Sequence, residues 1–241
     1  MVFFKRNEIK CQKLNSKLFS NAKMMLKSGS NCIDSLLGGG IETGTITQIY
    51  GASGTGKTSI CLMFSYNAAK NWKVAYLDTE GLSGERVKQI FVDESLLNNV
   101  FIYEIYDFKQ QSVAIKKLSK LCSNDNVKLI VVDCFTSLYR SELEDESKQI
   151  KIKRELTSQL TYLLGLARKR DVAVLITNQM YTDVKDSVDK PLGGPSLEHL
   201  TKVVIGLERL NKKRRATLIK HRWKAEGESC EFLITNRGIE P

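Results

Sequence analysis

The chain lacks long apolar runs and has only two histidines. None of its apolar runs reaches the roughly 18 residues of a transmembrane helix, so no membrane span is expected. Residues 1–6 lack the apolar segment of a signal peptide, and we therefore expect a cytoplasmic protein. With only His199 and His221 available, no zinc site is expected.

Cysteine pairs of the Cys-x-x-Cys kind are also missing. The six cysteines are scattered along the chain: Cys11, Cys32, Cys61, Cys122, Cys134 and Cys230. This usage predicts reduced, buried thiols that pack as small apolar side chains.

Basic residues are distributed unevenly, although the net charge of the chain is +10. Residues 1–28 carry seven Lys/Arg and one Glu, and residues 202–224 carry nine Lys/Arg and one Glu. The rest of the chain is therefore net acidic. Clustered basic charge in an otherwise acidic domain predicts a polyanionic partner, most simply nucleic acid. A surface that only keeps the protein soluble is the alternative.

A glycine-rich segment carries the clearest chemical signal. It consists of Gly51, Ala52, Ser53, Gly54, Thr55, Gly56, Lys57 and Thr58, and it fits the pattern G-x-x-x-x-G-K-[ST]. A buried strand is expected before it at 45–50 and a helix after it at 59–69. Glycines let backbone N–H groups close around phosphate oxygens, Lys57 reaches the β- and γ-phosphates, and the Thr58 hydroxyl binds Mg²⁺. The segment predicts binding of ATP with Mg²⁺; a glycine-rich turn that matches by chance is the alternative.

Strands and helices alternate through most of the chain. Apolar, β-branched runs at 45–50, 73–78, 100–103, 127–133 and 171–177 alternate with helical patterns at 59–69, 85–97, 109–121 and 150–168. This order predicts an α/β fold with a mostly parallel sheet covered by helices on both faces. Three β-prone runs follow without helices (203–209, 215–221, 230–235) and predict an antiparallel C-terminal edge.

Polar residues at the carboxyl ends of these strands complete a candidate site. Asp133 ends an apolar strand and is expected to hold a Mg²⁺-bound water. Glu80 ends another strand and is a candidate base that orients and polarises the attacking water, or alternatively a helix cap. Gln179 ends a third strand and could hydrogen-bond the γ-phosphate. Ligands of such sheets bind at this edge.

The motifs as a set resemble the RecA/RadA recombinase family. The similarity lies in Leu37–Gly44, the phosphate loop, Tyr76–Gly81, Leu129–Asp133, Leu175–Gln179, Tyr139–Glu146, Leu163–Lys169, Asn178–Val184, Pro191–Gly194 and the segment from Lys220 to Ser229. Together these segments cover residues 29–240, and they are most similar to the short archaeal members of the family.

The resemblance implies a RecA-type P-loop ATPase core at residues 29–241, preceded by a basic N-terminal arm at 1–28. It implies a role in homologous recombination and DNA repair, single-stranded or branched DNA as ligand, and self-association. A RadA-type recombinase or a Holliday junction resolvase is a further partner implied by the family. Lys220 and Arg222 are expected to alternate along one strand and to approach the γ-phosphate of a neighbouring protomer; a DNA patch is the alternative for both.

Several features depart from the strand-exchanging members of the family. The helical N-terminal DNA-binding domain has no counterpart in the residues before the core. The two loops expected to line a DNA channel, 141–148 and 180–195, are net acidic and would repel phosphates. Independent strand exchange is therefore not expected. DNA contacts are instead expected at Lys212, Lys213, Arg214 and Arg215.

The predicted function is a weak Mg²⁺-dependent ATPase that binds DNA and assists recombination. Two alternatives remain. One is a nucleotide-gated interaction module with almost no hydrolysis, and the other is a RecA-fold ATPase of the KaiC or hexameric helicase type. Acceleration of hydrolysis by DNA would separate the predicted function from the gated module, and a hexamer in ATP would favour the KaiC or helicase type.

Overall fold

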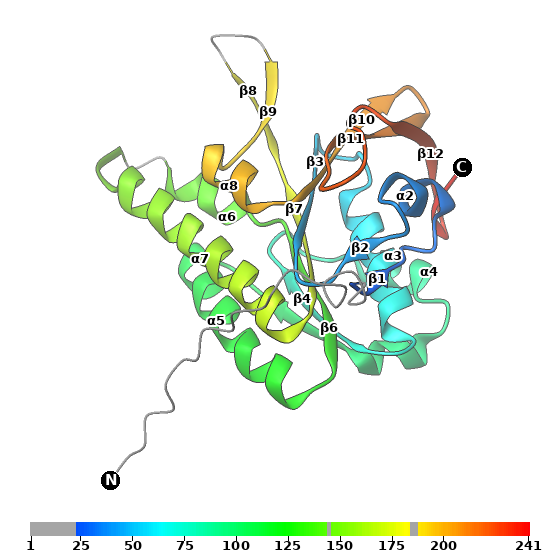
Figure 1. Ribbon diagram of the computed structural model, residues 1–241, viewed down its shortest axis with the longest axis horizontal. Coiled ribbons are helices and arrows are strands. Elements are labelled where there is room, and N and C mark those ends of the chain that lie inside the picture. Colours follow the sequence, from blue (N-terminus) through cyan, green and yellow to red (C-terminus); the bar gives the residue numbers. More distant parts are fainter. Residues whose placement is uncertain (1–22, 144–145, 184–187) are drawn as a thin grey trace, which may run out of the picture.

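A nine-stranded sheet organises this computed structural model, which describes residues 23–143, 146–183 and 188–241. The strand order is β13-β12-β11-β10-β3-β7-β6-β4-β5 (Figure 1). Neighbouring strands from β10 to β5 are parallel, whereas β11, β12 and β13 are antiparallel to the strands beside them. The predicted parallel sheet with an antiparallel C-terminal edge is confirmed.

The strands of the parallel part are β3 (Ile46–Gly51), β4 (Lys73–Asp78), β5 (Val100–Glu104), β6 (Val127–Asp133), β7 (Ala173–Asn178) and β10 (Val203–Leu210). The edge consists of β11 (Lys213–Lys220), β12 (Ser229–Thr235) and β13 (Gly238–Glu240). The main helices are α3 (Lys57–Ala69), α4 (Gly84–Ile90), α5 (Phe108–Asn124) and α7 (Gln149–Arg170). Within the described ranges, no helix is long and apolar enough to cross a membrane.

Alternating side chains of the central strands build two separate cores. Along β4, Val74 and Tyr76 point to the face that α3 covers, while Ala75 and Leu77 point to the face covered by α5 and α7. Figure 1 shows these helices on opposite faces of the sheet. Because both faces are buried, the strands are apolar in nearly every position, which is why they form continuous apolar runs in the sequence.

The helix expected at 85–97 is shorter than predicted. Helix α4 ends at Ile90, and a 3₁₀ helix, η1, covers Glu94–Asn99. Phe91 is 1% exposed and leaves the helical conformation with φ −86° and ψ 71°. The Asp93 side chain then accepts a hydrogen bond from the backbone N–H of Ser95 and starts the new helix. Burial of an aromatic ring and a strong capping residue together override the helical periodicity.

Several short elements were not predicted from the sequence. They are β1 (Met25–Leu26), α2 (Asn31–Leu36), β2 (Ile41–Glu42), α6 (Ser137–Glu142), η2 (Glu146–Lys148), the hairpin of β8 (Met180–Asp183) and β9 (Val188–Pro191), and α8 (Gly194–Leu200). Each is too short to show a clear hydrophobic period. The hairpin β8–β9 projects away from the main sheet (Figure 1).

The described part of the basic N-terminal segment, residues 23–28, lies against the core. Strand β1 pairs antiparallel with β2, and the Lys23 ammonium lies 2.9 Å from a carboxylate oxygen of Asp171. The Ser28 hydroxyl and backbone N–H both donate to Asp34. Gly40 has a positive φ of 134°, and a Cβ there would lie 2.2 Å from the carbonyl oxygen of Leu26. The close approach of the two backbones therefore requires glycine. Residues 1–22 lie outside the described ranges.

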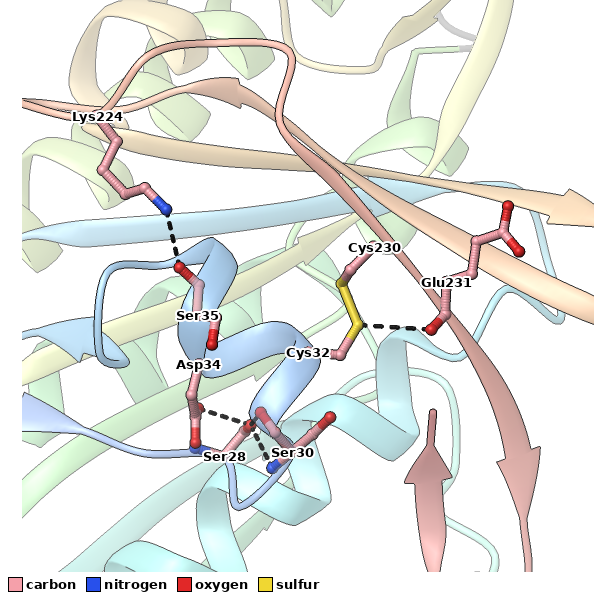
Figure 2. The surroundings of a disulfide bond; sticks show 8 residues. All are labelled: Ser28, Ser30, Cys32, Asp34, Ser35, Lys224, Cys230 and Glu231. Atoms are coloured by element: carbon pink, nitrogen blue, oxygen red, sulfur yellow. Dashed lines mark hydrogen bonds between the residues drawn. A yellow bond between two sulfur atoms is a disulfide. The ribbon is translucent and has the colours of Figure 1, made fainter.

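The expectation that the cysteines are reduced is wrong for two of them. Cys32 on α2 and Cys230 on β12 form a disulfide across a sequence separation of 198 residues (Figure 2). Cys61 and Cys134 are free and buried, and Cys122 is free and partly buried, as expected. Spacing along the sequence could not show the bridge, because the fold alone brings α2 beside β12.

Candidate nucleotide-binding site

The phosphate loop connects β3 to α3, as the motif predicts. Gly54 and Gly56 adopt positive φ values of 73° and 102°, and Gly56 caps the N-terminus of α3. A Cβ at Gly56 would also lie 3.3 Å from a methyl group of Ile234. The Thr55 hydroxyl closes the loop by donating to the carbonyl oxygen of Ala52 at 2.8 Å. Backbone N–H groups at a helix N-terminus are thus arranged in the manner that binds phosphate.

Lys57 begins α3, and its side chain folds back over the loop. The ammonium donates to the carbonyl oxygens of Gly51 at 2.8 Å and Ala52 at 3.0 Å, and the residue is 8% exposed. These contacts place a positive charge at the mouth of the loop. Thr58 follows on the same helical turn and is partly buried.

Asp133 ends β6 and is 2% exposed. One of its carboxylate oxygens accepts a hydrogen bond from the Tyr76 hydroxyl at 2.8 Å, and the other accepts one from the Thr177 hydroxyl at 2.5 Å. Burial first, and the nearby Asp133 charge second, raise the pKa of Tyr76 well above its usual value. The phenol therefore stays protonated, and its O–H group donates a hydrogen bond to Asp133. Two neighbouring strands, β4 and β7, fix the orientation of this carboxylate.

Glu80 lies just after β4, in a turn that another carboxylate organises. Asp78 accepts hydrogen bonds from the backbone N–H groups of Glu80, Gly81 and Leu82. Ser83, rather than Glu80, caps α4 by accepting from the N–H of Arg86. The Glu80 side chain is consequently not used as a cap, and its Oε1 accepts a hydrogen bond from the Gln179 side-chain amide at 2.7 Å.

A cavity of about 260 Å³ joins these residues. Its lining consists of Gly51, Ala52, Ser53, Lys57, Glu80, Arg140, Gln179 and Met180. Glu80 and Gln179, which are 99 residues apart in the sequence, therefore face one space together with Lys57. Arg140 was not predicted as a site residue. Two signals were available in the sequence: Arg140 follows Asp133 by seven residues, and it lies in the segment Tyr139–Glu146 that resembles the recombinase family.

A larger cavity of about 830 Å³ lies beside Glu80, between α4 and β5. Its lining is mostly apolar, with Leu82, Val87, Ile102 and Tyr106 among its residues, and it does not include the phosphate loop. A triphosphate carries several negative charges and needs N–H donors and cations, which the smaller cavity supplies. The smaller cavity is therefore the candidate site for the phosphates.

Comparison with known proteins identifies the family of this chain. The family model described as Rad51 matches residues 20–241. The chain belongs to the Rad51 family. A protein named DNA repair and recombination protein RadB from Archaeoglobus fulgidus is 71% identical over 219 residues, which are 91% of this chain and 99% of the relative. The RadB protein of Methanococcoides burtonii is 45% identical, over 90% of this chain and 98% of its own.

A solved structure gives the same result at the level of the fold. A crystal structure described as the RadB recombinase superposes with a TM-score of 0.77 and 37% identity, covering 90% of this chain and 99% of the other. The resemblance to archaeal RadB within the RecA/RadA recombinases and the RecA-type core are thereby confirmed.

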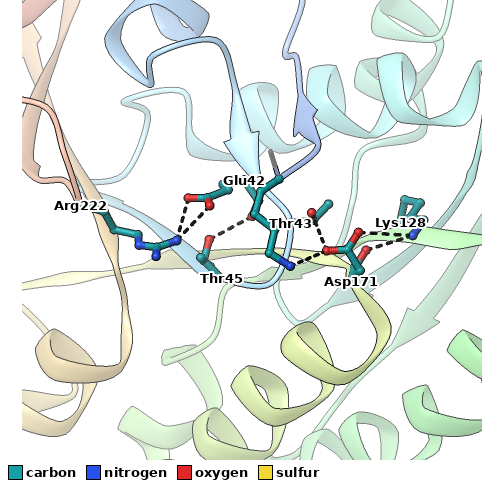
Figure 3. Close-up of polar contacts among 7 residues, drawn as sticks. Glu42, Thr43, Thr45, Lys128, Asp171 and Arg222 are labelled. Carbon is teal, nitrogen blue, oxygen red and sulfur yellow. Dashed lines mark hydrogen bonds and ion pairs between the residues drawn. The ribbon is translucent and has the colours of Figure 1, made fainter. Parts of the chain in front are cut away.

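The two cations expected to act across a protomer interface occupy different places in this Rad51-family chain. Lys220 is the last residue of β11, and its ammonium donates to the carbonyl oxygens of Glu198 at 2.5 Å and Thr201 at 3.0 Å. Arg222 lies beyond the end of β11 and donates to both carboxylate oxygens of Glu42, at 2.9 and 3.0 Å (Figure 3). The prediction that both residues lie on one strand is therefore wrong for Arg222, because β11 ends at Lys220.

Register shows that these cations lie far from their own phosphate loop. Lys220 pairs with Val204, the second residue of β10, and Val204 pairs with Gln48 in the first half of β3. The phosphate loop begins at the opposite end of β3, at Gly51. Lys220 therefore lies toward the amino end of the parallel strands, whereas the candidate site lies at their carboxyl end.

The four cations expected to bind DNA are not equivalent in the Rad51-family structure. Lys212 is exposed in the turn between β10 and β11. Lys213 lies 3.5 Å from Glu231, and Arg215 contacts Glu208 and Glu231 at 3.3 and 3.0 Å. Arg214 is only 8% exposed and donates through Nε to the carbonyl oxygen of Gly54 in the phosphate loop. The hairpin turn is basic, but one of its four cations is buried against the backbone of the phosphate loop.

The two acidic loops are described only in part. Glu144 and Asp145 of the first loop, and residues 184–187 of the second, lie outside the described ranges. The described part of the second loop forms the β8–β9 hairpin, which starts directly after Gln179. Gln179, which bonds to Glu80, is therefore the residue directly before β8.

Proposed function

We propose that the chain binds ATP with Mg²⁺ in the phosphate loop, hydrolyses it weakly, and binds DNA as an accessory protein of homologous recombination and DNA repair. The observation that carries this proposal is the shared cavity of the phosphate loop, Lys57, Glu80 and Gln179. A cation, a carboxylate and an amide that surround N–H donors of a helix N-terminus suit phosphoryl transfer to water.

The residues around the loop fit the triphosphate. Lys57 would bind the β- and γ-phosphates by exchanging its bonds to the Gly51 and Ala52 carbonyls for phosphate oxygens. Arg140 also lines the cavity and adds a second positive charge. Because the protein supplies these charges in fixed positions, no reorganisation is needed when charge develops on the phosphate oxygens.

The residues near the base of the cavity fit Mg²⁺, which would neutralise phosphate charge when bound. Thr58 offers a hydroxyl on the first turn of α3, and Asp133 would act through a water because it does not line the cavity itself. The hydrogen bonds from Tyr76 and Thr177 hold the Asp133 carboxylate in one orientation. Such outer partners are typical of groups that position metal-bound water.

Glu80 would orient the attacking water and accept its proton, because its carboxylate faces the same cavity as Lys57. Gln179 would hydrogen-bond the γ-phosphate with the same amide that holds Glu80. The amide nitrogen has two N–H donors, so it can serve both acceptors only from a position within reach of both. We expect weak hydrolysis, since the bond to Gln179 constrains where the Glu80 carboxylate can meet the attacking water.

Two observations support the proposed DNA binding and role in recombination. They are the basic hairpin turn between β10 and β11 and the relatives named DNA repair and recombination protein RadB. The partners we propose are single-stranded or branched DNA, further copies of this chain, and a RadA-type recombinase or a Holliday junction resolvase. Acidic residues in the two loops 141–148 and 180–195 make independent strand exchange unfavourable, because they repel phosphates. The proposal places the protein in the cytoplasm, with access to chromosomal DNA.

One observation favours a second candidate function, the nucleotide-gated interaction module. The bond from Gln179 to Glu80 connects the cavity directly with the β8–β9 hairpin. A γ-phosphate that takes the Gln179 amide would alter the start of β8 without any hydrolysis. In this second function, nucleotide binding changes the conformation of the β8–β9 hairpin, and that change rather than DNA binding is the functional result.

The deciding experiment is steady-state ATP hydrolysis with Mg²⁺, measured alone, with single-stranded DNA and with branched DNA. Lys57→Ala provides the matched background control. We expect slow hydrolysis that exceeds the Lys57→Ala background and rises with DNA. ATP binding without hydrolysis above that background, in the presence of either DNA, would support the gated module instead. A folded wild-type protein that binds neither ATP nor DNA would contradict the proposal.

A further inference from the structure

Arg214 connects the basic hairpin to the phosphate loop. Its Nε donates to the carbonyl oxygen of Gly54 at 3.0 Å. Its NH1 donates to the carbonyl oxygens of Lys212 at 3.2 Å and Lys213 at 3.0 Å, in the hairpin turn. A single guanidinium group therefore holds two backbone segments that are about 160 residues apart in the sequence.

The register of the sheet explains how the hairpin reaches the loop. Leu207 on β10 pairs with Gly51, the last residue of β3, so β10 continues past the start of the phosphate loop. The turn follows at Asn211, which has a positive φ of 49°. At about 3.3 Å per residue, Asn211 lies roughly 13 Å beyond Leu207. The hairpin turn thus stands beside the loop that binds phosphate.

Burial distinguishes Arg214 from the other cations of the turn. It is 8% exposed, whereas Lys212 and Lys213 are exposed, and Arg209, its register partner on β10, is exposed as well. A buried guanidinium requires hydrogen-bond acceptors, and here the acceptors in the described part of the chain are backbone carbonyls. Arg214 is therefore poorly placed to contact DNA directly, although a cation at this position looks like part of a DNA-binding patch in the sequence.

The bond to Gly54 acts on the peptide unit that closes the phosphate loop. The Gly54 carbonyl and the Thr55 N–H belong to the same peptide group, so a cation that donates to the carbonyl polarises the N–H and strengthens it as a donor. The loop contacts the C-terminal edge of the sheet at a second point, where Phe232 and Ile234 lie beside Gly56. The conformation of the loop therefore depends on β11 and β12.

We propose that Arg214 is a positioning residue that holds the phosphate loop in its binding conformation and couples nucleotide affinity to occupation of the hairpin turn by DNA phosphates. The proposal rests on the ATP and DNA binding proposed above. Phosphates that bind Lys212 and Lys213 would compete with Glu231 for Lys213, and would shift the backbone carbonyls that share the Arg214 guanidinium with Gly54. The two sites are then coupled through one group with a defined set of acceptors.

The test measures the dissociation constant for ATP, with and without a single-stranded oligonucleotide, in wild type, Arg214→Gln and Arg209→Gln. Arg209→Gln is the matched control, because it removes the same charge from the exposed register partner of Arg214 on β10. We expect about tenfold weaker ATP binding in Arg214→Gln without DNA, since a charge-assisted hydrogen bond is lost. We also expect the effect of DNA on ATP affinity to disappear in Arg214→Gln and to persist in Arg209→Gln.

A second readout separates positioning from loss of folding. Hydrogen exchange at the amides of Thr55 and Gly56, measured without nucleotide, should be faster in Arg214→Gln than in Arg209→Gln, while the strands of the sheet keep their protection. Arg214→Lys keeps the charge but not the forked geometry, and should recover only part of the ATP affinity.

The outcomes separate this inference from the proposed function. If wild type binds neither ATP nor DNA, the proposed function fails. If wild type binds both, the inference is overturned by equal ATP affinities in Arg214→Gln and Arg209→Gln, or by a wild-type ATP affinity that DNA does not change. Coupling must also be reciprocal, so ATP must change DNA affinity by the same factor in wild type.

Discussion

The Gln179 side-chain amide donates a hydrogen bond to the carboxylate of Glu80 at 2.7 Å. Glu80 follows β4 and Gln179 follows β7, and β6 lies between these strands in the sheet. Because all three strands end at the same edge, residues far apart in sequence meet above Asp133. The bond fixes one oxygen of Glu80, and it makes that carboxylate dependent on the position of Gln179.

Replacing Glu80 by Gln should slow hydrolysis without weakening ATP binding. The amide keeps the size of the side chain but cannot accept a proton from water. A general base contributes about 10²–10⁴-fold to such rates, and we expect a loss in that range. Single-turnover hydrolysis and ATP affinity, measured on the same preparation, check the prediction.

Glu94→Gln is the matched control for this substitution. Glu94 is an exposed carboxylate on η1, between β4 and β5, and it does not line the cavity of about 260 Å³. This variant should hydrolyse ATP at the wild-type rate. Wild-type rates in Glu80→Gln as well would show that Glu80 is not the base.

Lys57→Ala should weaken ATP binding and abolish hydrolysis while the protein stays folded. The ammonium bonds to loop carbonyls, so its removal takes charge from the phosphate site but leaves both cores of the sheet intact. Titration with a fluorescent ATP analogue measures the loss. Lys70→Ala removes a lysine from the exposed end of the same helix and should bind the analogue normally. Equal affinity in the two variants would contradict the assignment of the nucleotide site.

Local patterns in the sequence were sufficient for the sheet and for the main site residues. The phosphate loop, Glu80, Asp133 and Gln179 are adjacent to strong apolar strands, and the carboxyl ends of parallel strands necessarily meet. The sequence alone therefore predicts that these residues lie together. Their chemical roles remain predictions.

Contacts between distant segments could not be derived in the same way. Arg214 is one more cation in a basic run of the sequence, but the register of β10 against β3 places it against Gly54. The Cys32–Cys230 bridge likewise depends on how α2 packs on β12. The sequence contains the residues for both contacts, but only the folded chain determines their partners.

DNA binding should depend on the exposed end of the hairpin. Lys212→Gln/Lys213→Gln should weaken binding to all DNA sequences, because lysines that contact phosphates release counterions rather than recognise bases. Each lost contact should reduce the slope of log affinity against log salt by about 1. Fluorescence anisotropy at several salt concentrations measures both quantities. A double variant that keeps the wild-type affinity and slope would place the DNA site elsewhere.

The disulfide should stabilise the protein measurably. Cys32 and Cys230 close a loop of 198 residues, for which the chain-entropy estimate is up to about 5 kcal/mol in the free energy of unfolding. Reduction by dithiothreitol should lower the melting temperature of wild type to that of Cys32→Ser/Cys230→Ser. Thermal unfolding with and without the reductant checks this.

Cys122→Ser is the control for the disulfide, because Cys122 is a free, partly buried thiol whose pKa is raised to about 11 by burial. That variant should respond to dithiothreitol as wild type does. If wild type itself shows no response, Cys32 and Cys230 are not bridged in solution.

Lys220 and Arg222 should contact the γ-phosphate bound by a neighbouring protomer rather than the one bound by their own. Lys220 lies toward the amino end of the parallel strands, away from its own phosphate loop, and its ammonium points to the Thr201 carbonyl that precedes β10. Mixing Lys220→Ala/Arg222→Ala with Lys57→Ala combines an intact phosphate loop in one protein with intact cations in the other. We expect partial recovery of hydrolysis at intermediate ratios, because some interfaces then combine an intact phosphate loop with intact Lys220 and Arg222.

Lys202→Ala provides the control for charge alone. Lys202 lies just before β10, and its ammonium bonds to the His199 carbonyl, so the variant removes a cation from the same edge of the sheet without touching Lys220 or Arg222. It should hydrolyse ATP at the wild-type rate. If no mixing ratio restores hydrolysis, and the double variant loses DNA affinity instead, Lys220 and Arg222 belong to the DNA-binding surface. In that case their bonds to Thr201 and Glu42 are the contacts that DNA phosphates would have to replace.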